Sequence, residues 1–191
     1  MTIKLREVIK TSKEDIILRR VAKFGKVSYG IFEKTMRDYA KETNQVIEDT
    51  MIHEIYDAIK LPNRATAGSA GYDFHAPVGF TLKPNETIKI PTGIRCKMEP
   101  DWVLKLYPRS GLGFKYRLQL NNTVGIIDSD YYFSDNEGHI MAKITNASNE
   151  GKAVEIKAGD GFMQGIFLEY GITVDDDATE IRNGGFGSTG A

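Results

Sequence analysis

The feature that most constrains the fold is a series of short β-forming runs in the last two thirds of the chain. Gly, Pro, Asn and Asp separate these runs, and no helical pattern lies between them. Strands this short, at fairly even spacing, are typical of a sandwich, a jelly roll or a barrel. The sequence therefore predicts a mainly β domain with strands at 79–82, 86–90, 93–98, 102–107, 116–120, 124–127, 139–145, 153–157 and 162–170.

In residues 1–60 the apolar pattern is different. An alternating start fits a short strand. After Ser28 the apolar residues recur at helical spacing, with Ser28 placed as the N-cap, and a second apolar stripe runs from Ile47 to Ile59. Pro62 disfavours helical geometry at the residue before it and ends the second helix. We expect two helices in this segment.

This difference predicts two parts of the chain. Residues 1–60 form an N-terminal strand plus a helical insert packed on the core, and residues 61–191 form the β domain with a flexible Gly-rich tail from about residue 180. Two interpretations of the helices stay open. We favour amphipathic helices packed on the main domain, and the alternative is an arm that binds a protein partner.

Composition limits the classes of function. With 191 residues the chain makes one domain with a core of ordinary size. Its formal net charge of -1 gives no electrostatic footprint for nucleic acid or an anionic membrane, so we expect neither as a partner. The single cysteine, Cys96, cannot form an intramolecular disulfide and favours a reducing, cytoplasmic location. No signal peptide or membrane span is visible.

The strongest candidate for chemistry is the stretch from Val124 to Tyr131. An apolar run that predicts a buried strand leads directly into Asp128 and Asp130, and Tyr131 follows. A carboxylate placed where rigid structure meets a polar opening can act as a general base on water, and the aromatic side chain beside it can stack on a ring. The alternative is an acidic β-turn, which is the more frequent explanation of an isolated Asp-x-Asp.

Four polar side chains elsewhere could bind anions or a base. Arg109 and Ser110 lie next to glycines after a strand, which is the composition of an anion cradle, although a loop with a solvated arginine is equally compatible. The amide of Asn122 could hydrogen-bond a base edge, and Gln164 could donate to a phosphate or face a neighbouring strand. Asp73, in a Gly-rich segment, is more typical of a structural turn acid.

The Gly-rich end of the chain carries an unusual set of side chains. Arg182, Phe186, Ser188 and Thr189 provide a cation, a ring and two hydroxyls on a flexible support. The pattern is not a Walker loop, because no Lys precedes Ser188 and no helix can follow. We interpret the segment as a tail that closes over a bound nucleotide and excludes water from the reacting phosphate.

Taken together, these segments resemble the trimeric dUTP diphosphatase (dUTPase) family over about residues 61–191. Each piece alone is a weak signal, but five pieces in this order and spacing are specific. The matching pieces are Ala70-Gly71-Tyr72-Asp73, Pro108-Arg109-Ser110-Gly111-Leu112, Gly125-Ile126-Ile127-Asp128-Ser129-Asp130-Tyr131, Gly159-Asp160 with Gln164, and Arg182 followed by Gly184-Gly185-Phe186-Gly187-Ser188-Thr189-Gly190.

The resemblance implies a β jelly roll of the β-clip type, assembled as a homotrimer with active sites between subunits. It implies hydrolysis of dUTP to dUMP and pyrophosphate with Mg²⁺, which limits uracil in DNA and supplies dUMP for dTTP synthesis. Asp128 would be the general base that takes a proton from the water attacking the α-phosphorus. Tyr131 would stack under the deoxyribose and leave no room for a 2′-hydroxyl. Asp73 would reach the metal only through a water.

The resemblance also implies the substrate contacts. Asn122 and the backbone around it would read the uracil edge, and the tail would contact phosphates and cover the uracil ring. The implied substrate-binding residues are Arg109, Ser110, Gly111, Asn122, Gly125, Ile127, Tyr131, Gln164, Arg182, Phe186, Gly187, Ser188 and Thr189.

Two stretches depart from the family pattern. The fourth motif commonly reads Gly-Asp-Arg-Ile-Ala-Gln, but here Gly161 and Phe162 stand where Arg and Ile would be. One phosphate or interface contact is therefore missing or comes from elsewhere. The third motif usually continues Tyr-Arg-Gly, whereas here the residues from Tyr132 to Glu137 precede Gly138 and lengthen a loop near the site.

Two other functions compete with dUTP hydrolysis. A dCTP deaminase has the same fold and trimeric plan, but its chemistry needs a proton-shuttling Glu where this chain has Lys143. A nucleotide-sensing module would use dUTP to switch an interaction of residues 1–60. We favour it less, because the expected general base, Asp128, is present.

Overall fold

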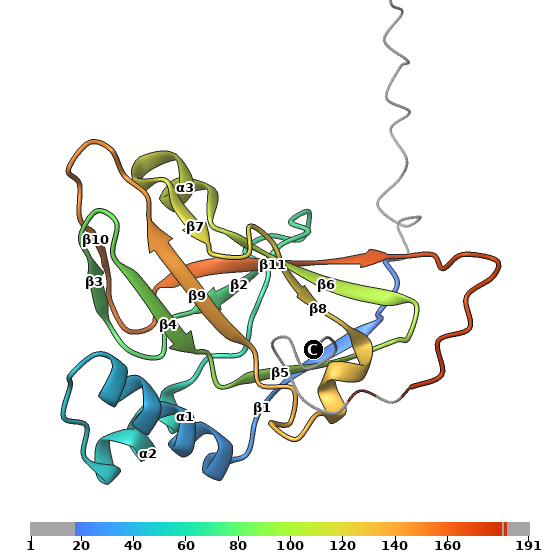
Figure 1. Ribbon diagram of the computed structural model, residues 1–191, viewed down its shortest axis with the longest axis horizontal. Coiled ribbons are helices and arrows are strands. Elements are labelled where there is room, and N and C mark those ends of the chain that lie inside the picture. The colour runs from blue at the N-terminus through green and yellow to red at the C-terminus, as the bar shows by residue number, and fades with distance from the viewer. Residues whose placement is uncertain (1–17, 181, 183–191) are drawn as a thin grey trace, which may run out of the picture.

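A computed structural model of the chain describes residues 18–180 and residue 182 (Figure 1). Within them the structure is mainly β, as the sequence predicts. In chain order the elements are β1 (Ala22–Lys26), α1 (Tyr29–Glu42), α2 (Asp49–Ala58), β2 (Tyr72–His75), β3 (Phe80–Leu82), β4 (Thr87–Pro91), β5 (Ile94–Met98), β6 (Trp102–Pro108), α3 (Ser110–Tyr116), β7 (Leu118–Leu120), β8 (Gly125–Ile127), the 3₁₀ helix η1 (Ser129–Phe133), β9 (Met141–Asn146), β10 (Val154–Ile156) and β11 (Gly161–Glu169).

Two antiparallel sheets carry most of the structure. The larger has the strand order β2-β11-β6-β8, and the second has the order β4-β9-β7. The pairs β1-β5 and β10-β3 complete the described strands. β11 and β6 lie in the middle of the larger sheet, so the middle of each strand is paired on both sides, and the end of β6 at Pro108 is paired with Met163 of β11.

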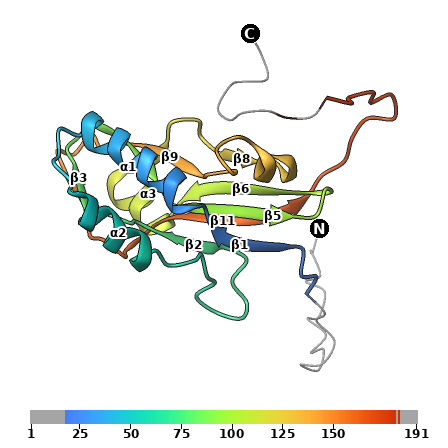
Figure 2. The same ribbon diagram turned by 90° about the horizontal axis from the view of Figure 1, so that it is seen from below.

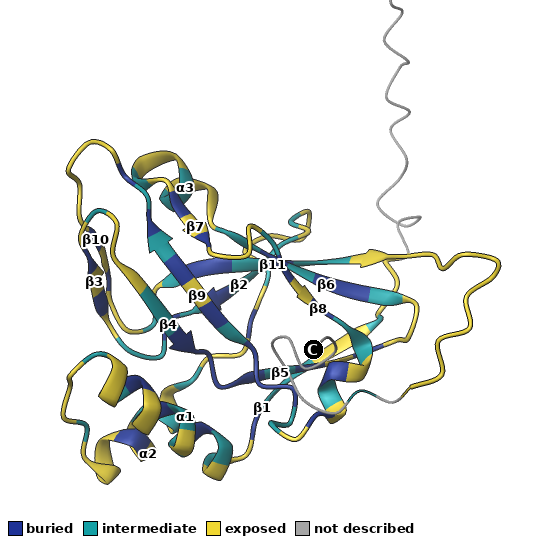
Figure 3. Cartoon of the chain, viewed as in Figure 1, coloured by how far each residue is buried: buried dark blue, intermediate teal, exposed yellow. Residues whose placement is uncertain are grey.

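The core follows from the two-residue period of the strands. Along β9, buried residues alternate with more exposed ones, which is the pattern of a sheet with one covered face. The main apolar cluster takes side chains from both sheets, for example Leu104 of β6 and Ile144 of β9 (Figure 3). Cys96 is buried in this cluster, and desolvation raises the pKa of its thiol to about 12, so it stays a neutral thiol.

The two N-terminal helices form as the sequence predicts. Ser28 caps α1, and its hydroxyl accepts a hydrogen bond from the backbone N–H of Ile31 at 3.4 Å. α1 and α2 bury an apolar cluster of their own, which also contacts Val78 and Ile88 of the β region. In Figures 1 and 2 the helices lie together at one end of the molecule, opposite the end of β11.

The N-terminal segment is not a separate layer. β1 pairs with β5 along its whole length, from Ala22 opposite Met98 to Lys26 opposite Ile94. The division of the chain at residue 60 therefore stays a prediction. The strand expected at the start of the chain lies outside the described residues.

β2 and α3 are elements that the sequence does not predict. Residues 72–75 were expected in a tight Gly-rich segment, but they form β2 and pair with β11, because Phe74 is buried in the core. The residues after Arg109 were expected to form a loop, but they form α3, in which Leu112 and Tyr116 pack against the core cluster. In both cases tertiary packing outweighs a local composition rich in glycine. No helix in the described part of the chain is long and apolar enough to cross a membrane.

A pair of glycines tests the packing of the helices on the β region. Gly93 has φ +72, and a Cβ there would lie 2.3 Å from Cδ1 of Ile59 and 3.2 Å from the ring of Phe32. Gly151 has nearly the same φ, +70, but open space around it. We expect Gly93→Ala to lower the free energy of unfolding by about 1–3 kcal/mol more than Gly151→Ala, because only the first adds a clash to the shared backbone strain. Urea denaturation measures both, and equal losses would contradict this packing.

Candidate active site

One cluster of polar side chains gathers where β6 ends, and we call Asp73, Arg109, Ser110 and Gln164 the Arg109 cluster. Gln164 of β11 stands opposite Asp73 of β2 on one side and Tyr107 of β6 on the other, so the sheet itself aligns these positions. Nε of Arg109 lies 3.3 Å from Oδ1 of Asp73. Nε2 of Gln164 donates to the carbonyl of Pro108 at 3.3 Å. The structure thus brings together four residues that the sequence singled out.

Two glycines make room for this cluster. A Cβ on Gly71 would lie 2.7 Å from Oε1 of Gln164. A Cβ on Gly161 would lie 2.7 Å from Nη1 of Arg109, which donates to the Gly161 carbonyl at 3.3 Å. Gly161 stands where the family pattern has Arg, and its missing side chain is what lets the Arg109 guanidinium lie over β11. This departure changes the position of Arg109 as well as removing a charge.

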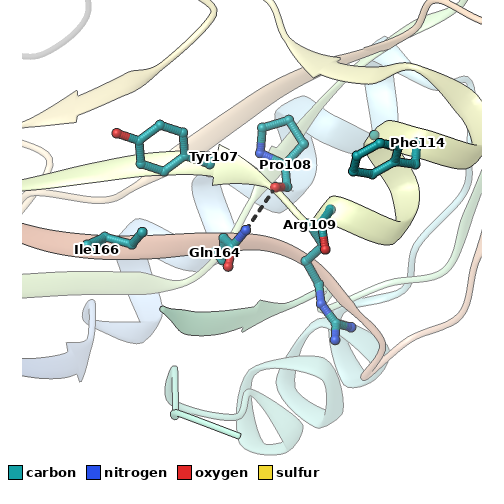
Figure 4. Close-up of a pocket in the computed structure, with 8 residues that line it drawn as sticks. Tyr107, Pro108, Arg109, Phe114, Gln164 and Ile166 are labelled. Atoms are coloured by element: carbon teal, nitrogen blue, oxygen red, sulfur yellow. Dashed lines mark hydrogen bonds between the residues drawn. The ribbon is translucent and has the colours of Figure 1, made fainter. Parts of the chain in front are cut away.

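An open cavity of about 570 Å³ adjoins the cluster. That volume suits a nucleotide-sized ligand. Figure 4 shows Tyr107, Phe114 and Ile166 near the opening, with the Arg109 side chain pointing away from the two rings. Its lining residues are Tyr107, Pro108, Arg109, Ser110, Gly113, Phe114, Gln164 and Ile166.

A second cluster lies where β8 ends, and we call Asp128, Asp130, Tyr131 and Arg182 the Asp128 cluster. Asp128 is the N-cap residue of η1, directly after the buried Ile127. Nη1 of Arg182 lies 2.7 Å from Oδ2 of Asp128 and 3.2 Å from Oδ1 of Asp130. The same guanidinium lies 5.5 Å from the ring centroid of Tyr131. Arg182 therefore covers both the carboxylate and the ring expected to contact substrate.

Burial and charge act in opposite directions on Arg182. Desolvation disfavours its charged form, but the hydrogen bonds and charges of Asp128 and Asp130 outweigh this and raise the pKa of the guanidinium. For Tyr131, desolvation is the largest effect and raises the pKa of the phenol, while its bond to Asn136 and the charge of Arg182 oppose it. The cluster is thus a fixed cation between two acids, over a neutral phenol.

Tyr131 is held by residues that the sequence did not single out as a site. Its hydroxyl donates to the backbone carbonyl of His139 at 2.8 Å and accepts from Nδ2 of Asn136 at 2.8 Å. The imidazole of His139 is fully buried, and its Nε2 accepts from the backbone N–H of Gly93 at 2.8 Å. These contacts come from the lengthened loop that departs from the family pattern, so no motif could have indicated them.

The same loop is tied to the N-terminal helices. The carboxylate of Glu137 accepts a hydrogen bond from the backbone N–H of Ser28, the residue that caps α1, at 2.8 Å. Nη1 of Arg95 of β5 lies 3.4 Å from Oε2 of Glu137, and Nη2 donates to the carbonyl of Tyr132 at 2.8 Å. The guanidinium carbon of Arg95 lies 3.8 Å from the centroid of the Tyr132 ring. An arginine does reach this loop, but from β5 and not from the position after the motif tyrosine.

The remaining expected site residues are placed less directly. Asn122 is exposed in the turn between β7 and β8. A Cβ on Gly125 would lie 3.0 Å from Cβ of Leu106, and the side chain of Ile127 is buried, so both can offer a ligand only their backbone. Ser110 and Gly111 are exposed in the first turn of α3. Phe186, Gly187, Ser188 and Thr189 lie outside the described residues.

The two clusters lie at opposite ends of one strand. β6 and β8 pair antiparallel with Leu104 opposite Ile127, so Asp128 lies level with the residue before Leu104, while Arg109 follows the other end of β6. About six residue steps along a strand correspond to roughly 20 Å. Figure 1 shows α3, which follows Arg109, far from the segment after β8. A carboxylate at that distance cannot deliver water to a phosphate bound by Arg109 of the same chain.

The pH dependence of stability tests the environment of His139. Burial lowers the pKa of its imidazole from 6.5 to about 4, against the opposing charge of Glu137. The unfolded chain therefore binds more protons between these two values, so stability is lost as pH falls from about 6.5 towards 4, by at most about 3 kcal/mol. His139→Gln, whose amide oxygen can still accept from the backbone N–H of Gly93, should not show this loss of stability at low pH. Denaturation with urea at several pH values measures it, and identical pH profiles would contradict burial of a neutral imidazole.

Comparisons with known proteins identify the family. The family model for dUTPase matches residues 57–190. The deoxyuridine 5'-triphosphate nucleotidohydrolase of Lactococcus lactis subsp. lactis (strain IL1403) is 42% identical over 136 residues, which cover 70% of this chain and 89% of the relative. The protein of the same name from Haemophilus influenzae (strain PittEE) is 40% identical over 138 residues, 68% of this chain and 87% of the relative.

Solved structures share the fold. The crystal structure of the dUTPase from Streptococcus mutans superposes with a TM-score of 0.54 at 37% identity, covering 61% of this chain and 89% of that chain. The dUTPase of phage phi11 of S. aureus, whose structure describes the coordination of a structural Mg(II) ion, gives a TM-score of 0.52 at 21% identity over 63% of this chain and 90% of that chain, and shows the fold alone. From the family match and these relatives, the chain belongs to the dUTPase family.

Proposed function

We propose that this protein hydrolyses dUTP to dUMP and pyrophosphate. It is an enzyme of nucleotide metabolism, a dUTP nucleotidohydrolase like the relatives it matches. The observation that carries the proposal is the place of Asp128, a carboxylate at the end of the buried strand β8, 48% exposed and therefore accessible to water. Hydrolysis limits the uracil available to DNA synthesis and supplies dUMP for dTTP, and we place it in the cytoplasm.

Asp128 acts as the general base. Its backbone is fixed between β8 and η1, so its carboxylate needs little reorganisation to accept a proton from a water beside the α-phosphorus. In the free protein Oδ2 accepts from Arg182. The family resemblance assigns Arg182 to a phosphate of the substrate. When Arg182 moves there, Oδ2 of Asp128 becomes free to accept a hydrogen bond from water. Arg182 therefore links substrate binding to exposure of the base.

Tyr131 provides the surface for the sugar. Its hydroxyl is fixed by His139 and Asn136, which leaves the ring face as its contact with a ligand. The Arg182 guanidinium now lies over that ring, where the deoxyribose would stack. Substrate binding thus displaces Arg182 from Tyr131 and Asp128 together. Asn122 and the backbone of Gly125 and Ile127 read the uracil.

The phosphates bind at the Arg109 cluster. Arg109 supplies a guanidinium fork, Ser110 a hydroxyl and Gln164 an amide, with backbone contacts from Gly111. In the free protein Arg109 is neutralised by Asp73, so a phosphate competes with that carboxylate for the guanidinium. From the tail, Ser188, Thr189 and Gly187 contact phosphates and Phe186 covers the uracil ring.

Magnesium would be held mainly by the substrate. Among the described residues no group of three or more His, Cys, Asp or Glu side chains is placed to bind a metal ion. Asp73 already faces Arg109 at 3.3 Å, so it would contact the hydrated ion only through a water. This donor set fits an ion that keeps most of its water. Bound Mg²⁺ would neutralise the charge of the triphosphate.

Assembly into a homotrimer would unite the two clusters. Each is incomplete alone, and β6 keeps them roughly 20 Å apart in one chain. A site formed by the Arg109 cluster of one subunit and the Asp128 cluster of another removes this separation. Exposed apolar side chains near the end of β11, including Tyr170, Ile172 and Val174, offer surface for such contacts.

The N-terminal segment braces the site in this proposal. The contact of Glu137 with Ser28 joins α1 to the loop that carries Asn136 and His139, and these two residues hold Tyr131. Residues 1–60 then form a packed support for the catalytic domain of residues 61–191. A protein partner on the exposed faces of the helices remains compatible with this role.

Hydrolysis is tested with dUTP, UTP, dTTP and dCTP in the presence of Mg²⁺. We expect pyrophosphate release from dUTP alone. Asp128→Asn should lower kcat by about 10²–10⁴-fold, the usual contribution of a general base. Asp38→Asn, an exposed acid on α1, is the matched control and should keep full activity. No release from any nucleotide, with dUTP still bound, would replace the hydrolase by a nucleotide sensor.

A further inference from the structure

A small cavity, lined mostly by apolar residues, lies near the Arg109 cluster, on the side of α2. Its volume is about 190 Å³, several times the roughly 30 Å³ that one water occupies. It opens between the end of α2, the end of β2 and the turn before β11. The lining residues are Ala58, Ile59, Lys60, His75, Ala76, Pro77, Ala158 and Gly159.

Two side chains with nitrogen donors, Lys60 and His75, line this cavity. The ammonium of Lys60 lies against Gly159, 3.4 Å from where a Cβ would stand, and within residues 18–180 and 182 it has no hydrogen bond or ion pair. Nδ1 of His75 is buried and has no hydrogen-bond partner there. Because a buried polar atom usually has a hydrogen-bond partner, Nδ1 of His75 indicates a missing one. Lys60 is exposed, and its ammonium at the edge of the same cavity makes an anion the ligand that suits both groups.

The cavity and the Arg109 cluster lie near each other across β11. His75 stands opposite Gly161 in the ladder of β2 and β11, and Arg109 lies over that same glycine. Lys60 lies over Gly159, only one residue away from Gly161 along the chain. The charges of both Lys60 and Arg109 act on His75, and together with desolvation they lower the pKa of its imidazole against the opposing charge of Asp73. The side-chain nitrogen groups of Lys60, His75 and Arg109 thus lie near one another along the turn that leads into β11.

This arrangement accounts for the altered fourth motif. Where the family pattern has Arg, this chain has Gly161, and Arg109 occupies the space of the missing side chain. The positive charge lost at that position is replaced nearby by Lys60, which comes from the N-terminal segment. Lys60 follows the end of α2, so the junction between the helices and the β domain contributes a side chain near Arg109.

We propose that Lys60 and His75 form an extension of the phosphate site, which holds the terminal phosphates of the nucleoside triphosphate and the pyrophosphate released from it. This inference rests on the proposed function, because it takes Arg109 as a phosphate ligand. Lys60 neutralises the terminal phosphate charge, and neutral His75 donates through Nδ1. Nucleoside monophosphates do not reach this position.

Inorganic pyrophosphate is the probe. In the full chain with Mg²⁺, Lys60→Gln should raise the inhibition constant of pyrophosphate and its dissociation constant in calorimetry by about tenfold, the equivalent of one lost charge-assisted bond. Inhibition by dUMP should not change. Lys83→Gln, an exposed lysine after β3, is the matched control, and His75→Phe gives a second, independent variant.

The outcomes separate this inference from the proposed function. Unchanged pyrophosphate binding in Lys60→Gln and His75→Phe, with dUTP hydrolysed, would overturn the extension and leave the hydrolase intact. An equal loss of pyrophosphate and dUMP binding would also overturn it, because that indicates general damage to the site. A third outcome is that the wild-type protein hydrolyses no nucleotide but binds pyrophosphate, and that Lys60→Gln weakens this binding. That result would support the anion site and overturn the hydrolase.

Discussion

The hydrogen-bonded ladder of β6 between β11 and β8 is the constraint on which the site depends. It places Gln164 opposite Tyr107, close to Arg109, at one end and Asp128 near the other. β6 is paired with β11 over its whole length and with β8 at Leu104–Leu106, so the strand fixes the distance between the two clusters within one chain. In the proposed function a single subunit presents two half-sites, and a second copy of the chain completes each site.

In the free protein the arginine of each half-site is paired with carboxylates of the same chain. Arg109 faces Asp73, and Arg182 faces Asp128 and Asp130. These pairs keep the cations in place, but a phosphate must compete with carboxylates to bind them. The competition has a functional consequence, since the pair that breaks at Arg182 frees the proposed base. In the proposed mechanism, binding of the triphosphate and activation of the base are therefore one event, driven by the charge of the triphosphate.

Much of this could be predicted from sequence, where the signal is local. The two-residue alternation of apolar residues predicts the strands, Ser28 predicts the start of α1, and five short motifs indicate the family. What was missed depends on distant contacts. β2 exists because Phe74 enters the core, and α3 exists because Leu112 and Tyr116 pack on it. The supports of Tyr131 come from a lengthened loop, and Lys60 lies in the junction after α2, and no family motif describes either. The motifs also could not show that their residues lie at two ends of a strand.

The separation of the half-sites is tested most directly by mixing two inactive variants. Arg109→Ala removes one half-site and Asp128→Asn the other, and each alone should hydrolyse almost no dUTP. If every site combines Arg109 of one subunit with Asp128 of another, co-assembled random trimers should regain about a quarter of the wild-type sites. Activity that rises to this level on co-assembly is the predicted result. No activity in mixed trimers would show that one chain supplies both residues, and would contradict the account.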